Sequence, residues 1–429
     1  FLKLVTGNQS AAQRYFFFSQ RQVAKIPDIP RETEKLKINE VGIIGAGTMG
    51  GGIAMNFANA NIPVTIVEQN QERLDKGIGI IRKNYENTAS KGRISLEDVE
   101  KRMSLINGDV SINSLSEKDL IIEAVFENMD LKKEIFSKLN TVAKNGAILA
   151  TNTSGLDINE IASTTDRPEN VIGLHFFSPA NVMKLLEVVR GEKTSKEVIA
   201  TSMAMAKSIG KIAALVGVCP GFVGNRILAQ RQREANKLIL EGALPWDIDD
   251  ALFDFGFPMG PFAMSDLAGL DIGWNKETSR GETIREKLCE NDRFGQKSGK
   301  GFYIYDENRN KSSDPEVEEL IINFAQEKQI KRRSINKEEI IERCLYPMIN
   351  EGFKILEEGM AIRASDIDII WINGYGWPVY EGGPMFYGNL IGFEKILKWL
   401  KKMEEEYGAD FTPSPYLEKV VKEKLNIFN

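Results

Sequence analysis

Histidine occurs once in the 429 residues of this chain, in the phrase Leu174-His175-Phe176-Phe177-Ser178-Pro179. The ordinary pKa of an imidazole, about 6.5, lets it both accept and donate a proton near neutral pH. If the chain performs proton chemistry with an imidazole, that imidazole belongs to His175. A single histidine beside two phenylalanines is also typical of a buried core residue, so the surrounding pattern has to decide between the two interpretations.

A carboxylate follows His175 at a sequence spacing that would allow the two side chains to pair. Glu187 lies twelve residues later, in Leu185-Leu186-Glu187-Val188-Val189, and a carboxylate among four aliphatic residues is costly to bury without a partner. If the connection between two strands centres on Asn181, positions 175 and 187 fall opposite each other, and the carboxylate would orient the imidazole and stabilise its protonated form. The alternative is that Glu187 faces solvent on an edge strand; we favour the pair because its neighbours are apolar.

A second chemical signal is the glycine-rich phrase Gly45-Ala46-Gly47-Thr48-Met49-Gly50, which follows a predicted strand and opens a predicted helix. In this pattern the first glycine makes a tight turn, the second admits a pyrophosphate, and the third lets the helix pack on the strand. The diphosphate would meet the free N–H groups at the start of the helix Met49–Ala60. The predicted cofactor contacts in this phrase are Gly45, Gly47, Thr48, Met49 and Gly50.

The end of the next predicted strand distinguishes between cofactors. Glu68 lies 23 residues after Gly45, where a carboxylate accepts hydrogen bonds from a ribose 2′-hydroxyl and repels a 2′-phosphate. Gln69, Asn70 and Gln71 supply no cation for a phosphate. We therefore expect NAD rather than NADP, and a flavin is the weaker alternative because the chain has no second FAD-type motif.

Composition excludes several other classes of protein. The net charge of −6 and the pI of about 5.4 argue against nucleic acid as the main partner. No apolar run approaches the roughly 18 residues that a membrane-spanning helix needs. Cys219, Cys289 and Cys344 are far apart and form no CxxC pair, so with one histidine we expect no metal site and a reducing compartment.

Between Ile38 and Val218, apolar runs alternate with longer amphipathic stretches. The predicted strands are Val41–Ile44, Val64–Val67, Leu120–Val125, Ala147–Ala150, Val171–Leu174, Leu185–Val189 and Ile212–Val216. The predicted helices are Met49–Ala60, Gln71–Ser90, Asp130–Ala143 and Ser195–Gly210. This alternation is the βαβ pattern of an open parallel sheet, which binds ligands at the carboxyl ends of its strands, where His175 stands.

After Cys219-Pro220-Gly221 the strand pattern stops, and helical stretches follow on both sides of a predicted loop at Asp306–Pro315. This half of the chain repeats itself. Leu240-Glu241-Gly242 returns as Glu357-Glu358-Gly359 and Asp249 as Asp366, both 117 residues later; Gly256-Phe257-Pro258 returns as Gly376-Trp377-Pro378 after 120, and Gly260-Pro261 as Gly383-Pro384 after 123. Two insertions of three residues in a duplicated helical domain explain the offsets, and the alternative is chance matching in Gly/Pro-rich loops.

The N-terminal segment has two interpretations. The chain begins with Phe1 rather than Met, so we expect the natural start to be missing, and no acidic residue precedes Asp28, as in a transit peptide. The alternative is a helix that ends before Pro27 and Pro30, with an apolar stripe formed by Ala12, Tyr15, Phe16, Ser19, Val23 and Ile26. We favour the helix because three consecutive phenylalanines need a surface on which to pack.

Taken together, these motifs resemble the 3-hydroxyacyl-CoA dehydrogenase family over essentially the whole chain. The phrases that carry the resemblance, in the family's order and spacing, are 45–50, Thr151-Asn152-Thr153-Ser154, His175–Pro179, Cys219-Pro-Gly-Phe-Val-Gly-Asn225-Arg226 and Gln296–Tyr303. The resemblance implies a catalytic dyad of His175 and Glu187, with Ser154 and Asn225 as polar contacts to the substrate oxygen and the imidazole. It also implies that Glu127 and Lys132 line the nicotinamide-ribose side of the cofactor cleft.

The implied fold is an α/β Rossmann-type NAD-binding domain followed by two all-α C-terminal-type domains that form an internal duplication. We predict a linker helix from a missing upstream module at 1–37, the NAD-binding domain at 38–217, a first helical domain at 218–310 and its repeat at 335–429. A second copy is similar to the multifunctional β-oxidation enzymes, in which an enoyl-CoA hydratase domain lies upstream. The second copy has no counterpart of Cys219-Pro-Gly-Phe, so we expect it to have a structural role.

The expected function is NAD-dependent oxidation of L-3-hydroxyacyl-CoA to 3-ketoacyl-CoA in fatty-acid β-oxidation, with His175 as the general base. The alternatives are a dehydrogenase of a β-hydroxy acid without CoA, and a non-catalytic dinucleotide-binding structural protein. The expected partners are an acyl-CoA thioester and an upstream hydratase domain, and the resemblance also allows association with a thiolase. We expect a monomer, since the second copy would replace a dimer partner, and a bacterial cytoplasmic location, with the peroxisome as the alternative.

Overall fold

The computed structural model describes residues 2–428. Phe1, the start of the first predicted domain, and Asn429, the end of the last one, lie outside the described residues. The chain divides into two compact units. The first contains the chain up to Arg226 together with Ile355–Tyr375 and 427–428, and the second contains Ile227–Lys354 and Gly376–Asn426. The predicted division into four domains is a different partition and stays a prediction.

The first unit is built on an eight-stranded sheet, counted over the described residues, with the order β3-β2-β1-β4-β5-β6-β7-β8. Its strands are β1 (Val41–Ile44), β2 (Val64–Val67), β3 (Ile106–Asp109), β4 (Leu120–Glu123), β5 (Ile148–Thr151), β6 (Val171–Phe176), β7 (Leu185–Arg190) and β8 (Ile212–Gly217). Neighbouring strands are parallel except β6 and β7, which run antiparallel. The prediction of a parallel sheet therefore fails at this one pair, where the expected pairing of positions 175 and 187 requires an antiparallel ladder.

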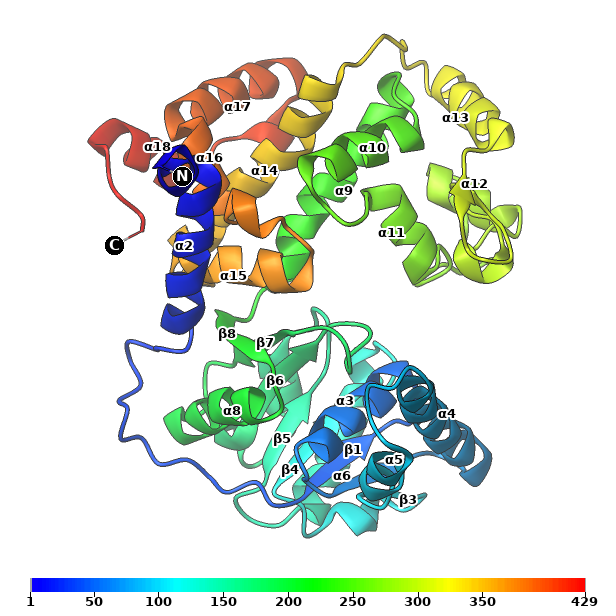
Figure 1. The fold of residues 1–429 in the computed structure, drawn as a ribbon, viewed down its shortest axis with the longest axis vertical. Coiled ribbons are helices and arrows are strands. Elements are labelled where there is room, and N and C mark those ends of the chain that lie inside the picture. Colours follow the sequence, from blue (N-terminus) through cyan, green and yellow to red (C-terminus); the bar gives the residue numbers. More distant parts are fainter. Residues whose placement is uncertain (1, 429) are drawn as a thin grey trace. The chain divides into compact units, whose positions relative to one another are not determined.

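Helices cover this sheet, and Figure 1 shows α3, α4, α5, α6 and α8 beside the strands. Those of the first unit are α1 (Leu2–Thr6), α2 (Asn8–Gln22), α3 (Thr48–Asn59), α4 (Gln71–Ser90), α5 (Leu96–Met103), α6 (Met129–Val142), α7 (Ile158–Ala162), α8 (Lys196–Ser208) and α15 (Ala364–Gly374), with short 3₁₀ turns at Ile112–Leu115 and Pro168–Asn170. Every residue of β1, β2, β4 and β5 is buried, as in parallel sheets that are covered on both faces. One core cluster joins the sheet to α3, α4, α5 and α8.

The sequence did not predict β3 or α5. β3 is the edge strand Ile-Asn-Gly-Asp, in which only Ile106 is buried, so it carries no apolar run for a pattern to detect. The helix α5 is short, although Ser95 and Asp98 cap its start through mutual side-chain to backbone hydrogen bonds. Neither element contributes to the candidate site.

The predicted leading helix is confirmed as α2. Ala12, Ser19 and Val23 of its expected stripe are buried, and the Tyr15 hydroxyl donates a 2.7 Å hydrogen bond to Asp368 on α15. Phe17 and Phe18 are nevertheless 50% and 64% exposed, so the expectation that the consecutive phenylalanines all pack on a surface is wrong. Neither belongs to the expected stripe.

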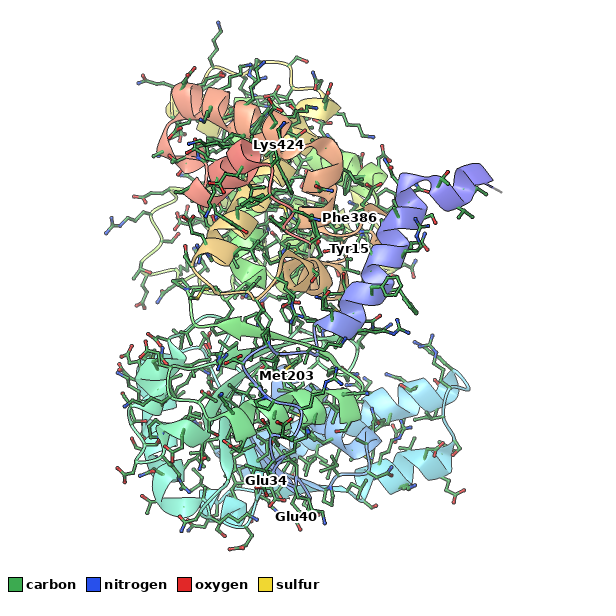
Figure 2. All side chains as sticks on the ribbon, turned by 90° about the vertical axis from the view of Figure 1, so that its left-hand side faces the viewer. Tyr15, Glu34, Glu40, Met203, Phe386 and Lys424 are labelled. Atoms are coloured by element: carbon green, nitrogen blue, oxygen red, sulfur yellow. The ribbon has the colours of Figure 1, made fainter. Side chains whose placement is uncertain are left out.

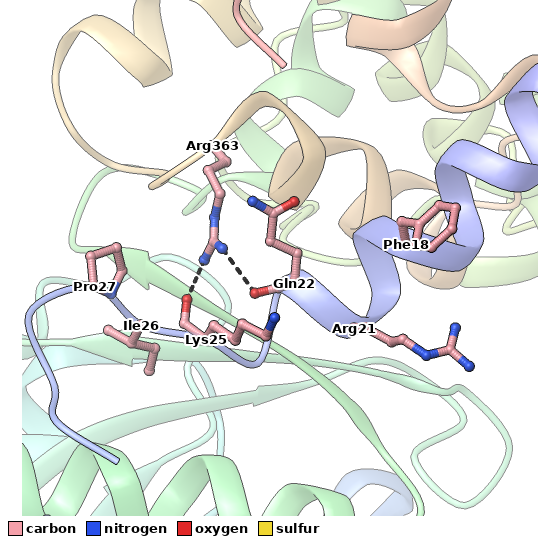
Figure 3. Close-up of a pocket in the computed structure, with 7 residues that line it drawn as sticks. All are labelled: Phe18, Arg21, Gln22, Lys25, Ile26, Pro27 and Arg363. Atoms are coloured by element: carbon pink, nitrogen blue, oxygen red, sulfur yellow. Dashed lines mark hydrogen bonds between the residues drawn. The ribbon is translucent and has the colours of Figure 1, made fainter. Parts of the chain in front are cut away.

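The end of α2 and the following linker are fixed to the same unit. The guanidinium of Arg363, just before α15, donates to the backbone carbonyls of Gln22 and Lys25 at 2.8 and 2.6 Å, as Figure 3 shows, and so caps the helix C-terminus. These residues border a pocket of about 420 Å³. Beyond it, the linker that carries Glu34 and Glu40 passes α8, on which Met203 lies (Figure 2), and the Leu36 amide donates to Thr201 of α8.

The second unit is mainly helical, and α9 (Gly224–Glu241) and α14 (Lys337–Glu357) contribute to both units. Its other helices are α10 (Pro245–Phe255), α11 (Pro261–Ala268), α12 (Ile284–Glu290), α13 (Pro315–Glu327), α16 (Pro384–Ile391), α17 (Phe393–Tyr407) and α18 (Pro415–Glu423), with 3₁₀ turns at Gln296–Ser298, Val379–Glu381 and Ala409–Phe411. A two-stranded antiparallel hairpin, β9 (Ile304–Tyr305) with β10 (Lys311–Ser312), lies partly in the segment predicted as a loop.

The repeated residues fall on equivalent elements. Asp249 and Asp366 both lie in the first half of eleven-residue helices, α10 and α15. Gly260-Pro261 and Gly383-Pro384 both begin eight-residue helices, α11 and α16. Because the helix lengths match as well as the residues, the repeat reflects a duplicated structure rather than chance matches in loops. No helix in the described part of the chain is long and apolar enough to cross a membrane.

Candidate active site

His175 and Glu187 face each other across the antiparallel pair β6/β7, as predicted from their spacing. The imidazole Nδ1 lies 2.8 Å from Glu187 Oε2, and the exposed fractions of the two residues are 5% and 0%. A carboxylate at Nδ1 favours the tautomer that carries its proton there, which leaves Nε2 to accept a proton from a substrate. The rings of Phe177 and Phe222 flank the imidazole, with centroids at 4.3 and 5.8 Å.

The second oxygen of Glu187 is held by the start of α9. Its Oε1 accepts a 2.9 Å hydrogen bond from the Gly224 amide, so both carboxylate oxygens have partners in a buried environment. The turn that delivers this amide has Gly221 at φ +73° and Phe222 at φ +50°. A positive φ is costly for phenylalanine, which indicates that the surrounding packing enforces this turn.

Ser154 and Asn225 lie together on the same unit. The Asn225 Nδ2 donates to the Ser154 carbonyl at 3.3 Å, and Asn225 follows directly after the Gly224 amide that binds Glu187. The Ser154 hydroxyl donates to Glu127 Oε1 at 3.0 Å, and the Ser154 amide donates to the same oxygen at 2.8 Å. The structure thus connects Ser154 to Glu127 as well as to Asn225.

Glu127 is the centre of a second polar cluster. Thr153 Oγ1 also donates to its Oε1, at 2.6 Å, and the Lys132 ammonium lies 3.4 Å from its Oε2. Burial acts to raise the pKa of the Glu127 carboxyl, but the hydrogen bonds from Thr153 and Ser154 and the charge of Lys132 together bring that pKa below its ordinary value. Glu127 is therefore ionised at neutral pH and remains an acceptor.

Glu123, which was not predicted from the sequence, holds Lys132 of this cluster. Its Oε1 accepts from the buried Lys132 ammonium at 2.7 Å, and its Oε2 accepts from the Thr151 hydroxyl at 2.7 Å. Glu123 ends β4, after the apolar run Leu120-Ile121-Ile122. The signal that could have found it is the one used for Glu187, since a carboxylate within an apolar run needs a buried partner.

The glycine phrase has the geometry that a dinucleotide needs. Gly45 has φ +105°, and a Cβ there would lie 2.7 Å from the Ala124 carbonyl; a Cβ on Gly50 would lie 1.9 Å from the Gly45 carbonyl. A Cβ on Gly47 would meet no heavy atom within 4 Å, so this side of the turn is open. Gly47 is the N-cap of α3 and makes no side-chain cap, which leaves the amides at Thr48 and Met49 available for an anion.

Glu68 lies at the same turn, beyond the end of β2. Its Oε2 accepts from the Ala46 amide at 3.0 Å and its Oε1 from its neighbour Gln69 at 2.8 Å. The carboxylate is thereby held beside the glycine phrase, where the predicted contact with a ribose hydroxyl requires it. The residues present therefore fit NAD.

The predicted catalytic and nicotinamide-side residues form one continuous series of contacts within the first unit. His175 contacts Glu187, Glu187 contacts Gly224, and the next residue, Asn225, contacts Ser154. Ser154 in turn contacts Glu127, and Glu127 contacts Lys132. Such a series at the carboxyl ends of β4, β5 and β6 can orient a hydroxyl-bearing substrate and remove its proton.

Comparison with known proteins agrees with this site. Residues 40–219 match the family model of the 3-hydroxyacyl-CoA dehydrogenase NAD binding domain, and residues 221–305 and 340–426 match that of the 3-hydroxyacyl-CoA dehydrogenase C-terminal domain. The chain therefore belongs to the 3-hydroxyacyl-CoA dehydrogenase family. The two C-terminal matches coincide with the two segments that carry the repeat.

Three similar proteins show how far this relationship extends. The human peroxisomal bifunctional enzyme is 42% identical over 451 residues, which cover 99% of this chain and 62% of the human protein. The dehydrogenase part of multifunctional enzyme 1 from Caenorhabditis elegans is 35% identical with a TM-score of 0.70, over 95% of this chain and 96% of that one. The 3-hydroxybutyryl-CoA dehydrogenase of Escherichia coli is 27% identical with a TM-score of 0.77, over 90% and 99%.

Proposed function

We propose that this chain oxidises L-3-hydroxyacyl-CoA to 3-ketoacyl-CoA with NAD. The observation that carries the proposal is the buried contact of His175 with Glu187, joined through Gly224 and Asn225 to Ser154. Bound NAD supplies the acceptor for the hydride that leaves C3 of the substrate. The carbon–oxygen double bond forms as the hydroxyl proton moves to Nε2 of His175.

Each residue has a defined part in this proposal. Glu187 keeps the proton on Nδ1, orients Nε2 toward the substrate hydroxyl, and stabilises the imidazolium that forms when that proton arrives. Asn225 offers an Nδ2 hydrogen to the substrate oxygen, whose negative charge grows as the proton leaves, and the Ser154 hydroxyl does the same when its single proton turns from Glu127 Oε1 to that oxygen. The imidazolium then releases its proton to solvent, which restores the base for the next turnover.

The reverse reaction is the most direct test. Purified protein should consume NADH when acetoacetyl-CoA is added, and free acetoacetate at the same concentration should give much slower turnover. Equal rates with both would favour a dehydrogenase of β-hydroxy acids without CoA. Binding of NADH with no turnover of either compound would favour a non-catalytic dinucleotide-binding protein.

We also propose that this chain is the dehydrogenase part of a longer enzyme with an enoyl-CoA hydratase module upstream. The support is that the chain spans 62% of the human relative, which is named a bifunctional enzyme, and that plant relatives are named multifunctional proteins of β-oxidation. The test is to extend the coding sequence upstream of Phe1 and to assay hydration of crotonyl-CoA by the longer product. A longer product with no hydratase sequence would contradict the proposal.

For the compartment, the relatives favour the alternative rather than the bacterial cytoplasm. Proteins 36–42% identical to this chain are named peroxisomal in animals and plants. We therefore propose a peroxisomal setting, which co-fractionation with a peroxisomal marker would test. The monomeric state and the association with a thiolase stay predictions, and light scattering of the purified chain would settle the first.

A further inference from the structure

The second helical copy contributes a segment, Ile355–Tyr375, to the unit that carries the candidate active site. The segment attaches to the end of β8, where the Gly217 amide donates to the Met360 carbonyl at 2.9 Å and Val216 bridges to Ala361. Glu358 then binds Arg226, the residue directly after Asn225, with Nη2 donating to Oε1 at 2.8 Å. The segment therefore reaches the turn that holds Glu187.

Tyr375, at the end of this segment, touches the site at three points. Its hydroxyl donates to Asn225 Oδ1 at 2.8 Å. Its ring packs edge-on against Phe177, with centroids 5.4 Å apart, and Phe177 is the ring next to His175. A Cβ on Gly224 would lie 2.4 Å from the Tyr375 hydroxyl, so only glycine allows the phenol to approach this amide.

We propose that Tyr375 is a positioning residue for the Asn225 amide, an inference that rests on the proposed function. An asparagine side chain has one end that accepts and one that donates, and it can rotate to exchange them. Because the phenol donates to Oδ1, the donating Nδ2 is turned toward the Ser154 carbonyl. The second Nδ2 hydrogen is then available for the substrate oxygen.

Packing alone does not account for this hydroxyl. The Tyr375 ring is already stacked on Trp371, with centroids 4.5 Å apart and an interplanar angle of 22°, and phenylalanine would keep that contact. The hydrogen bond to Asn225 is what tyrosine adds. The second copy, for which the sequence predicts only a structural role, thereby supplies a polar group that acts on the reaction through Asn225.

The test is Tyr375→Phe, which removes one oxygen and retains the ring. We expect kcat for acetoacetyl-CoA reduction to fall roughly tenfold, with NADH affinity and melting temperature unchanged. In an Asn225→Ala background the same substitution should have no further effect on kcat, because the amide that it positions is absent. The matched control is Tyr380→Phe, since Tyr380 is an exposed tyrosine of the same copy and its replacement should leave kcat unchanged.

Two results would overturn the inference and leave the proposed function unaffected. One is a Tyr375→Phe variant with wild-type kcat. The other is an equal loss of kcat in the wild-type and Asn225→Ala backgrounds, which would mean that Tyr375 acts independently of the amide. Failure of the wild-type chain to reduce acetoacetyl-CoA would overturn the proposed function, and this inference with it.

Discussion

Glu187 and Glu127 are both carboxylates of the candidate site, and they are held in different ways. Glu187 lies within a strand, is fully buried, and uses one oxygen for His175 and the other for Gly224. Glu127 lies in the loop after β4, has a side chain that is 41% exposed, and gathers three donors on one oxygen. The first is fixed by the register of two strands, and the second by a loop and a neighbouring lysine.

This difference separates two tasks. A buried carboxylate with both oxygens occupied can orient and stabilise an imidazole but has little capacity to bind a ligand. A partly exposed carboxylate with an open side can exchange a protein donor for a hydroxyl of a bound cofactor. We therefore expect changes at Glu187 to reduce the rate of the chemical step, and changes at Glu127 to reduce cofactor affinity.

The largest expected effect is on turnover, from Glu187→Gln. The amide has nearly the same shape but cannot stabilise an imidazolium, and it favours the wrong tautomer of His175. We expect kcat to fall by about 10⁴-fold with NADH affinity unchanged. The matched control is Glu192→Gln, at an exposed glutamate just beyond β7, which should retain wild-type kcat. A loss of NADH affinity in Glu187→Gln would break the proposed separation of tasks.

The next largest effect is on stability, and it comes from Lys132→Met, which replaces the lysine that pairs with Glu127. The substitution leaves the fully buried Glu123 without its cation, so we expect the unfolding free energy to fall by about 3–5 kcal/mol in urea titrations. Lys133→Met is the matched control, because Lys133 pairs with Glu160 at the surface and should contribute less than about 1 kcal/mol. Similar losses in the two variants would show that Glu123 does not depend on Lys132.

Glu127→Gln should have a smaller effect, and on a different quantity. The amide oxygen can still accept from Ser154, but the negative charge that strengthens a bond to a ribose hydroxyl is gone. We expect the Kd for NADH to rise roughly tenfold, measured by fluorescence titration, with a smaller change in kcat. Glu134→Gln, at an exposed residue of α6, is the control. A main effect on kcat would assign Glu127 to the chemistry instead.

The smallest expected effect is on the pH dependence of stability, and it concerns the connection between β6, which carries His175, and β7, which carries Glu187. The Lys211 ammonium donates to the Ala180 and Met183 carbonyls at 2.5 and 2.6 Å, and burial lowers the pKa of Lys211 to about 8. Between about pH 8 and the ordinary lysine pKa, the unfolded chain binds the extra proton, so this residue makes stability rise with pH. Urea titrations across this window should show that rise in the wild type and a weaker one in Lys211→Met. Parallel curves would contradict it.

The dyad could be predicted because its cause is local in the sequence. The spacing of His175 and Glu187 and the apolar neighbours of Glu187 determine a register that two adjacent strands then adopt. The glycine phrase is similar, since its steric requirements act within a few residues. The role of Glu68 could also be predicted, because the length of one βαβ unit places the end of its second strand at this residue.

Other parts of the site depend on contacts between distant segments and could not be predicted. Tyr375 meets Asn225 across 150 positions of sequence, and nothing near either residue indicates the pairing. Glu127 and Ser154 lie in the loops that follow β4 and β5, and the hydrogen bond between them depends on the conformations of both loops. Phe17 and Phe18 show a different failure: they lie outside the predicted apolar stripe, and the expectation that they pack rested on residue type alone.

Turnover by His175→Gln shows whether His175 is the base of an NAD-dependent dehydrogenase. The assay is NADH consumption with acetoacetyl-CoA, with NADH binding measured on the same preparation. We expect a loss of kcat of at least about 10⁴-fold and an NADH Kd equal to that of the wild type. Turnover within tenfold of the wild type would contradict it.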